Sequence, residues 1–171
     1  MKLKIYLASS WKNAEFVMVL EKLLAQQGFE IYNFCNPDAG HFSFNIAEEL
    51  TNAGCKLTDV DAISALTHPV IADSFKEAYK CDKEAIDWCN CLIMLMPCGR
   101  SAHLEAGYAK GQGKYLFIYW LNELVKGEFD NMYQFADGLY RMKELSLLIK
   151  KLKQIEAQDE NGACKADSGL D

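Results

Sequence analysis

Two continuous runs of apolar residues constrain the fold more than any other feature of the sequence. Cys91–Met96 reads CLIMLM and Tyr115–Trp120 reads YLFIYW, and neither run alternates between apolar and polar residues. Strands with this pattern are buried on both faces, which is typical of a parallel sheet covered by helices. Between the runs, the Ala- and Gly-rich segment Ala102–Gly111 predicts a helix that packs closely on the sheet.

The N-terminal part of the chain repeats this order of strand and helix. Leu3–Ala8 and Phe29–Phe34 are predicted strands, and Glu15–Gln27 between them has apolar residues at helical spacing. These segments and the two central runs predict an α/β domain. Its doubly wound, mostly parallel sheet of about five strands would have helices on both faces, in a flavodoxin-like or Rossmann-like arrangement.

The remaining segments have weaker patterns. Four further features are expected: an insertion with short helical pieces at 41–73, one or two helices in Val70–Trp88, a short strand around Tyr133–Ala136 and an amphipathic helix at Leu139–Ile155. We expect residues 1–157 to form a single domain and residues 158–171 to be a disordered acidic tail.

Composition excludes several classes of protein. The formal net charge is −6 and there is no basic stripe, so a nucleic acid polymer is not an expected partner. No apolar run approaches the length of a membrane span, and the N-terminus lacks a secretory pattern, so no membrane is expected either. The seven cysteines suit a reducing compartment, which predicts a cytoplasmic protein, and their spacing predicts no metal site.

Ligands of doubly wound sheets bind beyond the carboxyl ends of the strands, where the direction of winding reverses. Two loops meet this condition, because Ser9–Asn13 follows the first strand and Pro97–Ser101 follows the central one. These strands are neighbours in a flavodoxin-like order. The sequence therefore predicts a small-molecule site between the two loops.

The most informative stretch is PCGRSAHLEAG, at Pro97–Gly107. It places Glu105 about one helical turn after Ser101 and so puts a carboxylate beside the expected site. Gly99 would let a ligand approach the backbone, and Ser101 would cap the helix or bind a hydroxyl or phosphate near the first-turn amides. The alternative is that Glu105 only complements the helix dipole.

A second acid lies on an apolar helical face. In the segment FKEAYKCDKEAI, the residues that share a face with Asp82 are Ala78, Tyr79, Ala85 and Ile86. Two interpretations remain open for Asp82. It is either a pocket carboxylate suited to proton transfer or a structural residue in a salt bridge or at a helix start.

These residues resemble the nucleoside 2-deoxyribosyltransferase-like superfamily, which includes deoxynucleotide N-hydrolases. The resemblance spans about Lys4–Tyr119. It rests on the initial YLASSW, on the aspartate of YKCDKEAI, and on the run PCGRSAHLEAGYA with the GKY that follows it.

The resemblance implies cleavage or transfer of the N-glycosidic bond of a nucleoside or nucleotide, without a cofactor. Glu105 matches the nucleophile that forms a covalent glycosyl ester, and Asp82 matches the acid that assists the departing base. The residues expected to bind the substrate are Ala8, Ser9, Ser10, Trp11, Gly99, Arg100, Ser101, Phe42 and Phe44. The resemblance also implies a homo-oligomer.

Two parts of this substrate site depend on further arguments. Phe42 and Phe44 would form an aromatic wall for the base, or would instead anchor the insertion. The family's transferases often carry an acidic residue shortly before the nucleophile, whereas the turn here carries Arg100 and His103. This departure favours an anionic substrate, a nucleotide, over a free nucleoside.

Two other functions remain open. YLASSW and the later GFEIYNF also look like the opening of a bacterial TIR-like NAD glycohydrolase or signalling domain. The third possibility is a non-catalytic sensor that binds a nucleotide in the same crevice.

Overall fold

Five parallel strands form one sheet. The computed structural model describes residues 2–36, 46–124, 126–127 and 130–166 of the chain. The strands are β1 (Lys4–Ala8), β2 (Glu30–Asn33), β3 (Cys91–Met96), β4 (Tyr115–Trp120) and β5 (Gly138–Arg141). Their order is β2-β1-β3-β4-β5, and each neighbouring pair is parallel. The predicted α/β fold with a flavodoxin-like strand order is confirmed.

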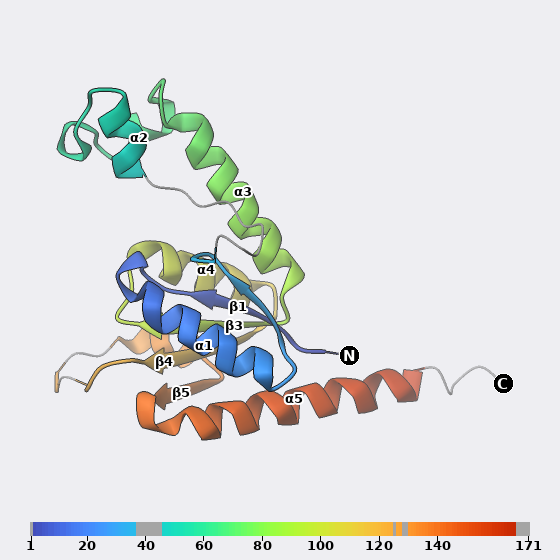
Figure 1. Cartoon of the computed structure of the whole chain (residues 1–171). Helices are drawn as coiled ribbons and strands as arrows, with labels where there is room; N and C mark the ends of the chain where they lie inside the picture. The colour runs from blue at the N-terminus through green and yellow to red at the C-terminus, as the bar shows by residue number, and fades with distance from the viewer. Residues whose placement is uncertain (1, 37–45, 125, 128–129, 167–171) are drawn as a thin grey trace.

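Helices cover both faces of the sheet (Figure 1). They are α1 (Ala14–Gln26), α2 (Ile46–Asn52), α3 (Ala72–Trp88), α4 (Arg100–Gly111) and α5 (Leu145–Ala166). One core cluster joins α1 and α5 to one face, and a second cluster joins α3 and α4 to the other. The buried side of α4 consists of Ala102, Ala106 and Ala109, and these small side chains let the helix lie close to the sheet.

The C-terminal part of the chain differs from the prediction in two places. The last strand is Gly138–Arg141, because Asn131–Phe135 forms a 3-10 turn in which Asp130 accepts a hydrogen bond from the amide of Met132. The last helix, expected at Leu139–Ile155, begins only at Leu145, because Gly138–Arg141 is a strand, and it continues through residues 158–166. Residues 167–171 lie outside the described part.

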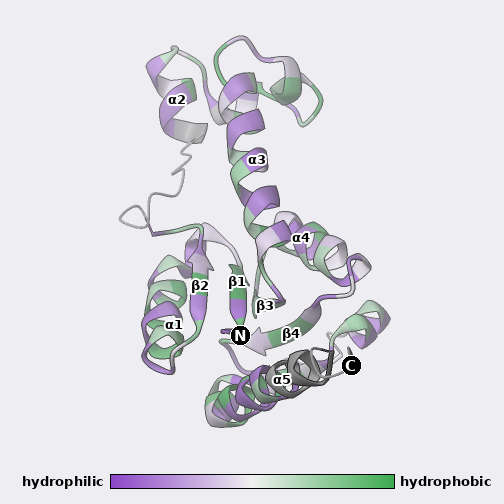
Figure 2. Cartoon of the chain, turned by 90° about the vertical axis from the view of Figure 1, so that its right-hand side faces the viewer, coloured by the Kyte–Doolittle hydropathy of each residue, from purple (hydrophilic) through white to green (hydrophobic). Residues whose placement is uncertain are grey.

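α2 and the N-terminal part of α3 project away from the body formed by the sheet and the other helices (Figures 1 and 2). The buried residues of α3 are Ala85 and Ile86, at the end of the helix that packs on the sheet. We refer to α2 together with residues 72–81 of α3 as the arm. Among the described helices, none has the length and apolar composition of a membrane span.

The two loops predicted to border the site lie against each other. The side-chain amide of Asn13 donates to Ser9 Oγ at 2.9 Å and to the carbonyl oxygen of Pro97 at 2.7 Å. Ser9 Oγ in turn donates to the carbonyl oxygen of Leu95 at 3.1 Å. These bonds hold the loop after β1 beside the loop after β3, which is where the strand order reverses direction.

Candidate functional site

Two stacked tyrosines line the sheet beneath α3 and α4. Tyr6 of β1 and Tyr32 of β2 are register partners, so their side chains point to the same face. Their ring centroids lie 5.0 Å apart and the ring planes differ by 10°. A buried tyrosine hydroxyl requires a hydrogen-bond partner, and here each hydroxyl has a carboxylate as its partner.

Each tyrosine contacts one of the two predicted acids. Tyr6 donates a hydrogen bond to Glu105 from α4. Tyr32 donates to Asp82 Oδ1 from α3 at 3.0 Å. The structure therefore brings Glu105 and Asp82 together over one tyrosine pair, although they come from different helices.

The position of each acid follows from how its helix is anchored. Glu105 lies between Ala102 and Ala106, whose burial against the sheet brings the carboxylate down to Tyr6. Asp82 lies about one turn before Ala85 and Ile86, the residues that fix the end of α3. Both acids are half-buried, so each remains accessible from one side.

Electrostatics couple the two carboxylates. Burial and, after it, the nearby charge of Asp82 raise the pKa of Glu105 from an ordinary value of 4.5 to about 7, while the hydrogen bond from Tyr6 acts in the opposite direction. Burial and the same two acids raise the pKa of Tyr6 and of Tyr32, so both phenols stay protonated and act as donors. A carboxyl group that titrates near neutral pH is characteristic of functional sites.

The loop after β1 uses its polar groups mainly for structure. Ala8 is buried at the end of β1, and Ser9 bonds to the neighbouring loop as described above. The hydroxyl of Ser10 accepts a hydrogen bond from the amide of Lys12 and caps a short 3-10 turn. Trp11 is 51% exposed and packs edge-on against Phe34, with 5.2 Å between centroids.

The start of α4 differs from the prediction in its cap. Gly99, and not Ser101, is the N-cap residue, and it has no side chain that could bond to the first-turn amides. Ser101 lies inside the helix, so its predicted capping role is wrong. Arg100 and Ser101 are both exposed, beside helix amides that have no side-chain cap.

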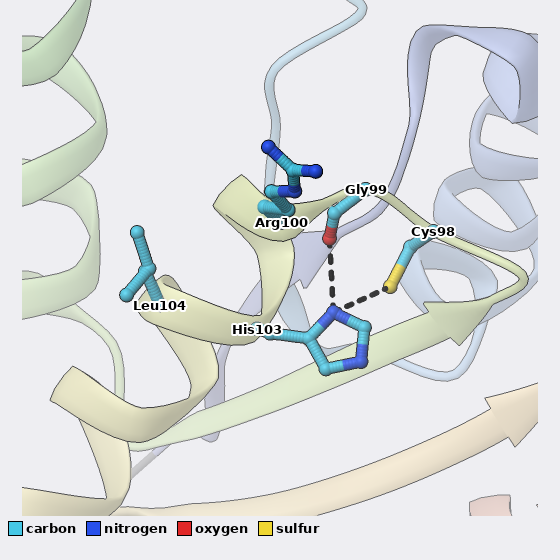
Figure 3. A pocket seen from close by; sticks show the side chains of 5 residues that line it. All are labelled: Cys98, Gly99, Arg100, His103 and Leu104. Carbon is cyan, nitrogen blue, oxygen red and sulfur yellow. Dashed lines mark hydrogen bonds between the residues drawn. The ribbon is translucent and has the colours of Figure 1, made fainter.

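A hollow of about 510 Å³ opens around this helix start (Figure 3). It is lined by Cys98, Gly99, Arg100, His103 and Leu104. His103 Nδ1 lies 2.9 Å from the carbonyl oxygen of Gly99 and 3.7 Å from Cys98 Sγ. Burial, and then the charge of Glu105, raise the pKa of Cys98 to about 11, so this thiol is protonated and lies within electrostatic reach of Glu105.

Some predicted features cannot be placed, and others were missed. Phe42 and Phe44 lie outside the described residues. In the described ranges, no group of three or more His, Cys, Asp or Glu side chains could hold a metal ion. Tyr6 and Tyr32, the hydrogen-bond donors to the two acids, were not predicted as part of the site. Their signal was a tyrosine at a strand position expected to be buried, where a hydroxyl needs a partner.

The hydrogen bond from Tyr6 leads to a prediction about pH dependence. This bond stabilises the charged form of Glu105, so Tyr6→Phe is expected to raise the pKa of Glu105 above about 7. Any activity that needs ionised Glu105 would then start at a higher pH, and the acidic limb of a kcat/KM profile would move upward. An unchanged acidic limb would contradict the assignment of that limb to Glu105.

The fold and this pair of acids define a class: a flavodoxin-like α/β protein with two coupled carboxylates at the reversal point of its sheet. No family model and no curated protein matches the sequence. Among solved structures, the chain is similar to a CMP N-glycosidase, BcmB, of Clostridium botulinum. The two share 15% identity with a TM-score of 0.50, over 88% of this chain and 98% of that chain. This likeness agrees, at the level of the fold, with the resemblance found in the sequence motifs.

Proposed function

We propose that this protein is an enzyme that cleaves or transfers the N-glycosidic bond of a nucleoside or nucleotide. The observation that carries the proposal is the pair Glu105 and Asp82, which approach each other over Tyr6 and Tyr32. Two carboxyl groups on one site are what retaining cleavage of a glycosidic bond requires. The sequence resemblance, and the similarity of fold to a protein described as a CMP N-glycosidase, support the same reaction class.

In the proposed first step, an oxygen of ionised Glu105 attacks the anomeric carbon and forms a glycosyl ester. The bond between this carbon and the base nitrogen breaks and its electron pair stays on the nitrogen. Asp82, which in the reactive form carries the one proton that the coupled pair holds, supplies that proton to the base. In the second step Asp82 takes a proton from water, or from an acceptor base. The resulting nucleophile attacks the anomeric carbon, and the carboxylate of Glu105 is released.

The start of α4 suits an anionic substituent on the sugar. Its first-turn amides have no side-chain cap, and Arg100 is exposed beside them. Such a helix start, together with a guanidinium group, favours a phosphate. We therefore propose a nucleotide as the substrate in preference to a free nucleoside.

The proposal is tested by incubating the full chain with a panel of ribo- and deoxyribonucleosides, their 5′-monophosphates and NAD, with and without a free acceptor base. Chromatography then separates the products. Free base alone indicates hydrolysis, and an exchanged base indicates transfer. Release of nicotinamide while nucleosides and nucleotides stay intact would support the TIR-like alternative. If no compound loses its base, the proposal is contradicted, and binding without turnover would favour a sensor.

We also propose that the protein is a homo-oligomer. Tyr79, about one turn before Asp82 on α3, is 67% exposed, and both acids are half-buried. A second copy packed on this side of α3 would bury Tyr79 and enclose the two acids. Size-exclusion chromatography with light scattering is expected to show a dimer or a larger assembly, and a monomer at all concentrations would contradict this proposal.

A further inference from the structure

Tyr32 occupies a position that neither the sequence motifs nor the proposed reaction explains. Its strand, β2, is at the edge of the sheet, yet its side chain is buried beneath α3. Its ring lies on Tyr6 and its hydroxyl donates to Asp82 Oδ1 at 3.0 Å. It thus links β2 to the acid on α3.

We propose that Tyr32 is a positioning residue that holds Asp82 in place for protonation of the departing base. This inference rests on the proposed function and assigns each of the two acids to one tyrosine. Tyr6 holds the carboxylate that attacks the sugar, and Tyr32 holds the acid that assists the leaving group. Stacking of the two rings fixes both hydroxyls relative to the same pair of strands.

The surroundings of Tyr32 support this role. The groups whose charges raise the pKa of Tyr32 include Asp82 and Cys81 from α3 and Glu105 from α4. Asp82 Oδ1 accepts the hydrogen bond of the Tyr32 hydroxyl. A phenylalanine at this position would fill the same space and stack equally well. The hydroxyl is therefore the part of Tyr32 that the packing does not require.

Placement of the acid matters because of where Asp82 lies in the fold. It belongs to α3, whose residues before Asp82 are part of the projecting arm, whereas Glu105 lies between two buried alanines on α4. A hydrogen bond from a residue of the sheet fixes the carboxyl of Asp82 against the same framework that holds Glu105. Proton transfer requires such placement within hydrogen-bond distance of the leaving nitrogen.

The test uses two substrates that differ only in the leaving group. One is the nucleoside or nucleotide that the wild-type protein cleaves best. The other carries the same sugar, and the same phosphate if one is needed, with 4-nitrophenolate in place of the base. This leaving group departs as an anion without a proton, so its release requires Glu105 and does not require an acid. Steady-state kcat and KM are measured for both substrates with the full chain.

Tyr32→Phe is expected to lower kcat/KM on the natural base about 10- to 100-fold, the scale of loss when a reacting group lies about 1 Å from its productive position. With 4-nitrophenolate its kcat/KM, which reports only the steps up to release of the leaving group, should stay within about twofold of wild type. Tyr6→Phe is expected to lower kcat with both leaving groups, because it acts through Glu105. Asp82→Asn should follow the pattern of Tyr32→Phe.

Tyr119→Phe is a matched control. Tyr119 also donates a hydrogen bond from a partly buried hydroxyl, at 2.9 Å to the carbonyl oxygen of Met142, but it belongs to the core cluster on the opposite face of the sheet. It should retain kcat with both leaving groups and lose stability to a similar degree in urea denaturation. Any loss of stability in Tyr32→Phe is thereby separated from its effect on the acid.

The outcomes distinguish this inference from the proposed function. If wild type releases neither a base nor 4-nitrophenolate, the proposed function fails. If wild type is active and Tyr32→Phe matches wild type on the natural base, the positioning role is wrong. It is also wrong if Tyr32→Phe loses activity equally with both leaving groups, because that result indicates a general disturbance of the site.

Discussion

Glu105→Gln is expected to reduce base release about 10⁴-fold or more, the scale seen when a covalent nucleophile is removed. The amide keeps the shape of the side chain and its place between Ala102 and Ala106, but it cannot form the glycosyl ester. The loss should appear in kcat with the natural base and equally with 4-nitrophenolate. A Glu105→Gln variant within tenfold of wild type would contradict the assignment of the nucleophile.

Stability measurements provide a control for this variant. The pKa of Glu105 in the folded protein, about 7, lies above its ordinary value of 4.5. Between these two pH values the unfolded chain loses this proton before the folded protein does, so the contribution of Glu105 to the free energy of unfolding falls as pH rises. Glu105→Gln lacks this pH-dependent loss of stability. It should therefore gain stability relative to wild type between pH 5 and pH 8, measured by urea denaturation at several pH values.

Asp82→Asn is expected to lower kcat for the natural base by about 10²- to 10⁴-fold, the range for loss of a general acid. The asparagine still accepts a hydrogen bond from Tyr32, so the packing of α3 on the sheet is kept. Because the charge of Asp82 raises the pKa of Glu105, Asp82→Asn should also move the acidic limb of the kcat/KM profile to lower pH. Pre-steady-state measurements would locate the loss in the step that releases the base.

A comparison of the two leaving groups shows which step Asp82→Asn affects. A large loss of kcat/KM with the natural base and a small loss of kcat/KM with 4-nitrophenolate supports protonation of the base by Asp82. A loss of equal size with both would mean that Asp82 serves the sugar or the fold. Glu105 would then require another acid as its partner.

The sheet could be predicted because its central strands have a pattern that few folds accommodate. Cys91–Met96 and Tyr115–Trp120 have the predicted bounds, since continuous apolar strands must be covered on both faces. The last strand and the last helix were placed less well. The position of the strand follows a turn capped by the side chain of Asp130, which hydrophobic periodicity does not report, and the strand in turn delays the start of the helix to Leu145.

The acids could be predicted, but the groups that organise them could not. Glu105 and Asp82 stand out because a carboxylate beside apolar helix residues is unusual. The pairing of Tyr6 with Tyr32 depends on the register between β1 and β2, and the sequence does not state a register across an intervening helix. The bond from Ser9 Oγ to the carbonyl oxygen of Leu95 also joins residues that are far apart in the sequence, so it became visible only in the folded chain.

The way in which α3 is anchored has a mechanical consequence. The helix is anchored to the sheet at Ala85 and Ile86 and extends from there back to Ala72. At about 1.5 Å per residue, Ala72 lies about 20 Å from this anchored end and Asp82 only about 5 Å from it. A tilt that swings the tip by about 4 Å would thus shift Asp82 by about 1 Å. The outer end of the helix would therefore move about four times as far as Asp82 moves over the tyrosines.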